Sequence, residues 1–339
     1  MEYYDVIVVG ASIAGLECAK NLGGSNLNVL IIERNKQIGR KVCAEGIIPS
    51  DLNYIPKHLI NFDFQRIIIH YKNKATTFFK NKGIISTIER KTFLDYEVKN
   101  LKRFSNIEIL TGTSLSEITS NNSLKLNTGK KLEFKFLIGA DGSTSIVRKY
   151  LNLVSGKLEI AIQYIIPKRL EDFEVYLDNK LFGTGYLWIF PNKNYTSIGC
   201  GTDLRFMESK TLKHNFDLWL KEHSFDVQNA KFEGALINYD YKGYKFGNIF
   251  LAGDAAGLTS GILGKGIYSA FLSGKQIARD ILRVNNAPNL VTEWLKKKKR
   301  QEKYMFFLKN SLLRKIFFSV MINLLPYRKF EEKAIKMIE

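Results

Sequence analysis

The hexapeptide Gly10-Ala11-Ser12-Ile13-Ala14-Gly15 directly follows a short apolar stretch, Val6–Val9. In a strand–turn–helix unit, the first glycine permits the tight turn, and the last permits close packing of the helix on the strand. Free N–H groups at the start of such a helix bind phosphate. Ser12 stands where a middle glycine is common, and its small side chain still allows a diphosphate to approach. The pattern predicts a dinucleotide site at Ser12, Ile13 and Ala14; a turn without a ligand is the alternative.

Glu33 ends the next apolar stretch, which runs from Leu27 to Ile32. An acidic residue at this distance from the glycines accepts hydrogen bonds from a ribose diol, and its charge disfavours a 2′-phosphate. We place Arg34, the following residue, at the same end of the site. These residues predict an adenosine dinucleotide but do not distinguish NAD from FAD.

A second segment, Phe250-Leu251-Ala252-Gly253-Asp254-Ala255-Ala256-Gly257, makes that distinction. An acid at the end of a buried strand can bind the ribityl hydroxyls of FAD, although Asp254 could instead be only a helix cap. We assign Gly253, Gly264, Gly266 and Ile267 to the same site. The positive end of the helix that follows would face the pyrimidine end of the flavin and stabilise its anionic reduced form.

Strands and helices must bring these two segments together. Residues 5–33 predict strand, turn, helix and strand, and residues 134–138 and 248–252 predict two more buried strands. Short β-rich stretches lie between them, at 66–71, 74–80, 83–88 and through most of 158–245. Helices are predicted at 91–104 and near 212–221.

This order predicts an α/β fold with a Rossmann-like FAD-binding domain, whose mixed sheet is mainly parallel. We expect residues 1–60, 89–155 and 246–285 to form that domain. Residues 61–88 and 156–245 would form a β-rich substrate domain inserted in two segments. Residues 286–339 would form a basic, helical C-terminal segment.

The charge of the 339-residue chain is uneven: the net charge is +18, and residues 296–339 hold 13 Lys or Arg against 4 Glu. We find no nucleic-acid-binding motif and expect no nucleic-acid partner. The basic segment also carries apolar side chains, namely Tyr304, Phe306, Phe307, Leu312, Leu313, Ile316 and Phe317. It predicts either a helix that faces an anionic membrane or an ordinary solvated helix.

The three cysteines (Cys18, Cys43 and Cys200) have no paired spacing, which favours a reducing cytoplasm. The four histidines lack ligand spacing, so we expect no metal site. No targeting segment fits the start of the chain. The apolar run from Phe317 to Leu325 is too short to cross a bilayer, which needs roughly 20 residues.

Taken together, the motifs resemble the p-hydroxybenzoate-hydroxylase-like flavoproteins. The resemblance rests on the two segments above and on Gly139-Ala140-Asp141-Gly142 with Arg148 beyond it. Within that group, Gly39-Arg40-Lys41-Val42-Cys43-Ala44-Glu45-Gly46-Ile47 and Tyr186-Leu187-Trp188-Ile189-Phe190-Pro191 resemble two stretches of the geranylgeranyl reductase family. The match covers most of residues 1–280.

The resemblance implies an FAD-dependent reductase that saturates double bonds of a geranylgeranyl-type chain, on an archaeal-type lipid or a prenyl diphosphate, by hydride transfer from reduced flavin N5. It places Cys43 near the flavin, as a proton donor or as part of the wall, together with Ala44 and Asp141. Trp188 and Phe190 would line the substrate cavity, or else be ordinary core aromatics.

Three basic residues each have two alternative roles in this scheme. Arg40 and Lys41 would contact a phosphate of FAD or be solvated, and Lys41 is the weaker candidate. Arg90 would lie over the ribityl chain or on the surface. The segment after Asp254 departs from the family, because Gly261 replaces a proline and Lys265 replaces an acid.

Two other functions fit the same motifs: an FAD-dependent monooxygenase or halogenase, and a flavin electron-transfer protein. The chain has one dinucleotide fingerprint, so electrons would come from transiently bound NAD(P)H or from a ferredoxin-like carrier. The expected localisation is cytoplasmic, with attachment to a membrane surface as the further option.

Overall fold

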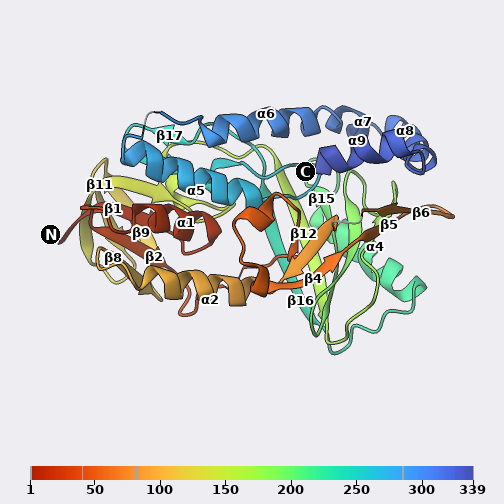
Figure 1. The fold of residues 1–339 in the computed structure, drawn as a ribbon, viewed down its shortest axis with the longest axis horizontal. Helices are drawn as coiled ribbons and strands as arrows, with labels where there is room; N and C mark the ends of the chain where they lie inside the picture. The colour runs from red at the N-terminus through yellow and green to blue at the C-terminus, as the bar shows by residue number, and fades with distance from the viewer. Residues whose placement is uncertain (1, 40, 81–82, 285, 339) are drawn as a thin grey trace.

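The computed structural model describes residues 2–39, 41–80, 83–284 and 286–338. Within these ranges the chain forms three β-sheets, with helices packed around them (Figure 1). The largest sheet has the strand order β17-β18-β11-β1-β2-β8. These strands are Lys245–Phe246, Ile249–Leu251, Lys131–Gly139, Glu2–Val9, Val29–Glu33 and Ile107–Thr111. A hairpin of β9 (Leu115–Ser120) and β10 (Ser123–Leu126) is joined to β11.

All pairings from β18 to β8 are parallel. Val9 of β1 is paired with Gly139 of β11 and with Ile32 of β2, and Gly139 is paired with Leu251 of β18. The carboxyl ends of these four strands therefore meet at one edge. Ligands of open α/β sheets bind at that edge, and the predicted glycine-rich segments follow β1, β11 and β18.

Helices α1 (Ile13–Leu22), α2 (Arg90–Leu101) and α5 (Ile267–Ile281) cover one face of this sheet, where Val6, Val8 and Ile31 contribute to the shared core. The alternate side chains, such as Ile7 and Leu30, pack on the other face with the β9–β10 hairpin. A short helix, α3 (Ile146–Tyr150), lies on that second face.

The second sheet has the order β16-β12-β15-β14-β13-β5-β6. Its strands are Lys231–Asn238, Leu158–Ile166, Thr196–Asp203, Tyr186–Pro191, Glu174–Leu177, Arg66–Tyr71 and Lys74–Phe79. The pairings are antiparallel except that of β13 with β5. Helix α4 (Ser209–Glu222) buries Leu212, Phe216 and Trp219 against one face of this sheet. The other face is turned toward the first sheet.

A third, small sheet consists of β3 (Gly46–Ile47), β7 (Ile85–Ile88) and β4 (Ile60–Phe64). The short strands predicted between residues 66 and 88 therefore divide between two sheets. Alternation of apolar residues indicates a strand but does not encode which strand will be its partner. The short helices η1 (Asp51–Asn53) and η2 (Lys57–Leu59) lead into β4.

The C-terminal segment forms α6 (Leu290–Glu302), α7 (Met305–Lys309), α8 (Ser311–Leu324) and α9 (Arg328–Ile338). Helix α6 packs on α5, and α8 packs on β5 and β6. The segment thus runs along one side of the molecule from the first sheet to the second (Figure 1). Buried Trp294 anchors α6, because its Nε1 donates a hydrogen bond to the Leu258 carbonyl over 2.7 Å.

Within the described ranges, no helix combines the length and the apolar character needed to span a bilayer. In the same part of the chain, no cluster of three His, Cys, Asp or Glu side chains is arranged to hold a metal ion.

The contact between α1 and α5 depends on Gly274. A Cβ atom at this position would lie 3.0 Å from the Cys18 nitrogen and closer still to the Ala14 carbonyl oxygen. We expect Gly274→Ala to lower the free energy of unfolding by about 1–3 kcal/mol, as overpacking does, although alanine favours a helix by about 1 kcal/mol. Urea unfolding measures this. Gly156→Ala is the control, because its Cβ would only touch Asp240 Oδ2 at 3.6 Å; equal stability of the two variants would contradict the role of Gly274.

Candidate functional site

The turn after β1 is shaped for close backbone contact. Gly10 has a φ of +106°, and a side chain there would overlap the Ala140 carbonyl group. A side chain at Gly15 would overlap the carbonyl oxygen of Gly10. Among the described residues, no side chain caps the start of α1 at Ser12, and its first turn has no acid. The positive end of α1 is therefore available to an anion.

Arg90 stands beside this helix end. Its side chain is buried, with only 5% of the residue exposed, so the alternative of a position on the surface is wrong. Its Nη2 donates to the Ser12 hydroxyl over 2.8 Å, while its Nε is buried and has no hydrogen-bond partner in the described part of the chain. An unpaired guanidinium donor next to a helix N-terminus suits a diphosphate.

Glu33 lies at the end of β2, next to the same turn. Its Oε2 accepts a hydrogen bond from the Ala11 nitrogen at 2.9 Å, and its Oε1 accepts two from the backbone and side chain of Asn35. The carboxylate is therefore fixed beside the phosphate end, where the adenosine ribose of a dinucleotide would lie. Arg34 is exposed at the rim of the cavity.

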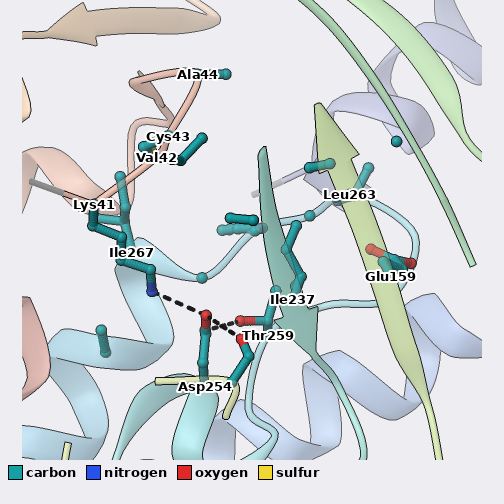
Figure 2. A pocket seen from close by; sticks show the side chains of 18 of the residues that line it. Lys41, Val42, Cys43, Ala44, Glu159, Ile237, Asp254, Thr259, Leu263 and Ile267 are labelled. Atoms are coloured by element: carbon teal, nitrogen blue, oxygen red, sulfur yellow. Dashed lines mark hydrogen bonds and ion pairs between the residues drawn. The ribbon is translucent and has the colours of Figure 1, made fainter. Parts of the chain in front are cut away.

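Asp254 follows β18 at the start of η3 (Gly253–Ala256) and faces the same cavity (Figure 2). It accepts hydrogen bonds from Thr259 at 2.6 Å and Ser143 at 3.2 Å, and it pairs with Lys41 at 3.0 Å. Burial raises the pKa of Asp254, but Lys41 and Thr259 outweigh it, so the pKa lies below its ordinary value. Lys41 is therefore not simply solvated, because it pairs with the acid predicted to hold the ribityl chain.

Two further residues hold the strand ends in place. Arg148 donates hydrogen bonds to the carbonyl groups of Leu153, Ala255 and Asp240, and so it ties α3 to η3. Asp141 accepts from the nitrogens of Ile146 and Val147 through one oxygen. Its other oxygen is buried and has no partner among the described residues.

Residues 41–45 line the cavity. They include Cys43, whose Sγ accepts a hydrogen bond from the Glu45 nitrogen at 3.3 Å. Arg40 lies outside the described residues. Glu45 fastens the loop, because its carboxylate accepts hydrogen bonds from Tyr195, from Asn192 and from the backbone nitrogen of Arg90. Burial raises the pKa of Glu45, and Tyr195 and Arg90 oppose the rise.

The facing wall is the free face of the second sheet. Trp188 is buried, and its Nε1 donates to the Ser197 hydroxyl at 2.9 Å. That hydroxyl donates to Gln163, which reaches the Cys43 carbonyl at 3.2 Å. Phe190 stacks on Phe173, with a centroid distance of 3.8 Å. The aromatic strand is therefore linked to the Cys43 loop by hydrogen bonds, which core packing alone would not require.

One cavity of about 750 Å³ joins these parts. The predicted site residues that line it are Gly10, Ser12, Ile13, Ala14, Glu33, Arg34, Cys43, Ala44, Arg90, Asp141, Trp188, Phe190, Gly253, Asp254, Gly264, Gly266 and Ile267. Gly15 is absent from the lining because it acts in the packing of α1 on the turn. Glu33 and Asp254, more than 200 residues apart, thus face one space.

The residues fit FAD. The buried Nε of Arg90 and the buried Oδ1 of Asp141 both lack partners among the described residues, and the glycine turn leaves room where any Cβ would intrude. An uncapped helix start, a ribose-binding acid and a second acid follow one another along the cavity wall. This donor set matches a diphosphate, an adenosine ribose and a ribityl chain.

The segment that departs from the family, Gly261–Ile267, closes the cavity beside α5. Lys265 lies over the rings of Tyr268 and Trp294, at 5.3 and 5.5 Å from their centroids. Its ammonium group therefore interacts with α5 and α6. Tyr186 holds the segment from the opposite wall, because its hydroxyl donates to the Leu263 carbonyl at 2.9 Å.

The polar residues that line the cavity without a predicted role include Glu45, Gln163 and Glu159. Glu159 is the one charged residue of β12, and this is a signal that the sequence offered. Glu45 and Gln163 gave no such signal, because their partners come from distant parts of the chain.

No family model matches the chain. It is 32% identical to an uncharacterized protein of Methanosarcina barkeri over 295 residues, which cover 83% of this chain and 75% of that one. It is 27% identical to the digeranylgeranylglycerophospholipid reductase of Methanosarcina acetivorans over 304 residues, covering 81% and 74%. A solved structure of a geranylgeranyl bacteriochlorophyll reductase-like protein from Thermoplasma acidophilum superposes with a TM-score of 0.80 at 19% identity, covering 100% of this chain and 96% of that one.

Arg90 offers a direct test of the phosphate end. We expect Arg90→Met to weaken FAD binding about 10- to 100-fold, because a charge-assisted hydrogen bond contributes about 1.5–3 kcal/mol. Titration of the FAD-free protein, followed by flavin fluorescence, measures the dissociation constant. The control is Lys91→Met, which removes an exposed charge from the same helix. If both variants bind FAD as the wild type does, Arg90 has no contact with the cofactor.

Proposed function

Because the chain belongs to the geranylgeranyl reductase family of FAD-dependent oxidoreductases, we propose that it saturates C=C bonds of a geranylgeranyl-type chain on a membrane lipid or prenyl diphosphate. Bound FAD, once reduced, supplies a hydride from its N5 atom. The observation that carries the proposal is the shape of the cavity, which continues from the FAD site into an apolar pocket.

That pocket lies between the second sheet and the C-terminal helices. Its walls are aliphatic and aromatic side chains that lie in or directly next to β5, β6, β13, α7 and α8, namely Ile67, Ile69, Phe78, Phe173, Val175, Leu177, Leu308, Phe317, Phe318, Met321 and Leu325. A long hydrocarbon chain gains about 25 cal/mol for each Å² of apolar surface it buries there. The pocket therefore suits an isoprenoid better than a polar substrate.

An isolated alkene has no carbonyl group to polarise, so the protein must act mainly by positioning. Small residues (Ala161 of β12, and Gly199 and Gly201 of β15) line or adjoin the cavity beside Trp188. A Cβ at Gly199 would overlap the Trp188 ring. Gly199 thus makes room for the Trp188 ring, Ala161 and Gly201 leave space in the cavity, and Trp188 and Phe190 exclude water from the flavin site.

The electron donor is NAD(P)H or a ferredoxin-like carrier. Neither requires a second dinucleotide fold, and the positive net charge of the chain suits an acidic carrier protein.

Lipid analysis tests the reaction. When the FAD-loaded protein is reduced with dithionite and mixed with a digeranylgeranyl lipid, we expect a gain of two mass units per saturated bond. Asp254→Ala should lose most of this activity because its FAD site is damaged. Oxygen uptake without a change in lipid mass would indicate a monooxygenase instead, and rapid flavin oxidation by a carrier with unchanged lipid would indicate an electron-transfer protein.

We further propose that the C-terminal helices rest on an anionic membrane surface. Helix α8 is apolar on both sides. Phe318 and Ile322 are buried, whereas Leu312, Ile316 and Val320, four residues apart, form an exposed stripe. On α7, Phe306 is 67% exposed. A helix that is apolar all round needs a second apolar surface to cover it.

The charges of the C-terminal segment also support contact between α8 and an anionic membrane surface. Lys298 and Arg314 are buried and bind carbonyl groups, so they contribute to packing and not to the surface. The exposed basic residues are Lys296, Lys297, Lys299, Arg300, Lys303, Lys309, Lys315, Arg328, Lys329 and Lys333. They lie on or next to α6, α7, α8 and α9, in the same C-terminal segment as the exposed stripe of α8, and such a combination of basic and apolar side chains suits acidic headgroups. The sequence-based inclusion of Phe317 among lipid-facing residues is wrong, because Phe317 lines the cavity.

Sedimentation with vesicles tests this orientation. We expect the protein to pellet with vesicles rich in phosphatidylglycerol and to be released as salt rises. The double variant Leu312→Gln with Ile316→Gln should weaken binding to vesicles about tenfold or more. The reason is that the wild-type leucine and isoleucine side chains move from water into the membrane on binding. The control is Val154→Gln with Leu218→Gln, two exposed apolar residues elsewhere. Equal loss in both double variants, or none in either, would rule out α8 as the docking surface.

A further inference from the structure

A carboxyl group faces the cavity from the second sheet. Glu159 is near the start of β12, where it pairs with Asp203 of β15 on one side and Ile237 of β16 on the other. Glu159 lines the cavity, as do Ile237 and Leu263. Figure 2 shows it on the opposite side of the cavity from Lys41, Val42 and Cys43.

The surroundings of Glu159 differ from those of the other acids in the site. Asp254 and Glu45 each accept several hydrogen bonds. For the Glu159 carboxyl group, no hydrogen bond or ion pair is found within the part of the chain that the structure describes. Tyr186, which shares this wall, already uses its hydroxyl on the Leu263 carbonyl. The carboxyl group is therefore free to meet a bound molecule.

Burial raises the pKa of Glu159 well above its ordinary value, and the negative charge of Asp203 raises it further. The charged or titratable groups that act on Glu159 come from β14, β15, α6 and the end of β16. They are Tyr186, Asp203, Arg205, Tyr239, Lys298 and Glu302. Lys298 and Arg205 lower the pKa but do not reverse the shift. The protonated form is thus favoured, and that form can donate a proton.

We propose that Glu159 is the acid that protonates the alkene carbon during saturation. This inference rests on the proposed function. Saturation adds a hydride, with its electron pair, to one carbon of the double bond and a proton to the other. The hydride comes from the reduced cofactor, which is oxidised. The O–H bond of Glu159 breaks as the new C–H bond forms, and the carboxylate left behind regains a proton from water.

Cys43 is the competing donor, and its position distinguishes the two. Cys43 and Glu159 line opposite walls of the cavity (Figure 2). A substrate held between them would present opposite faces to the two groups. Protonation by Glu159 and protonation by Cys43 would therefore occur on opposite faces of the double bond.

The test uses FAD-loaded enzyme reduced with dithionite, with single-turnover lipid saturation followed by mass spectrometry. We expect Glu159→Gln to slow saturation at least 100-fold, within the usual range for general acid catalysis. FAD affinity and the rate of flavin reduction should not change. Glu159→Asp, which keeps a proton but shortens its reach, should restore part of the rate. The matched control, Glu117→Gln at an exposed position of β9, should equal the wild type.

The pH profile separates a proton donor from a structural residue. The wild-type rate should be high while Glu159 is protonated and should fall as pH rises through its raised pKa. This falling limb should disappear in Glu159→Gln and remain in Cys43→Ala. The reverse pattern, with the limb lost only in Cys43→Ala, would assign the proton to Cys43 and overturn the proposal.

A readout that does not need turnover completes the test. The infrared difference between wild type and Glu159→Gln at neutral pH should contain the C=O band of a protonated carboxylic acid. If this band is absent, or if Glu159→Gln saturates lipid at the wild-type rate, Glu159 is not the proton donor, and the proposed lipid reductase function is unaffected. If the wild type leaves every lipid unsaturated while binding FAD, the proposed function itself fails, and the role of Glu159 falls with it.

Discussion

The parallel register of β2, β1, β11 and β18 is the constraint on which the site depends. Because Ile32, Val9, Gly139 and Leu251 lie in one row across the sheet, the segments that follow them emerge side by side. One row of hydrogen-bonded strands thereby joins three parts of the chain that are each about 100 residues apart. The α1–α5 contact and the bonds from Arg148 then hold the loops in place.

The sequence predicted this half of the molecule well, for a physical reason. Gly10, Glu33 and Asp254 act through local backbone geometry, and local geometry leaves a mark in residue type and spacing. Their convergence also follows from parallel pairing, which is the usual result of alternating strands and helices. The α/β class and the FAD-binding chemistry were accessible for these reasons.

The other half of the site was less accessible. Glu45 acts through Tyr195 and Asn192, about 150 positions away, and no local pattern signals such a partner. A lysine in a loop is usually solvated, which made Lys41 the weaker candidate for a phosphate contact, yet Lys41 pairs with Asp254. The division of the strands between 66 and 88 into two sheets, and the burial of Lys298 and Arg314 within a basic segment, likewise depend on tertiary contacts.

Helix α8 separates the apolar pocket from the surface by the thickness of one helix. In water, the inner apolar side chains of α8 are buried, whereas the outer ones are exposed to solvent. In contact with hydrocarbon, both sides of the helix lie in an apolar environment. The free energy needed to shift α8 would then be far lower than in solution, because the apolar side chains that become exposed would contact acyl chains instead of water. Such an enzyme would expose its apolar pocket chiefly at a membrane surface, where the lipid substrate is present. Turnover would then rise with the area of membrane surface supplied and not with lipid concentration alone.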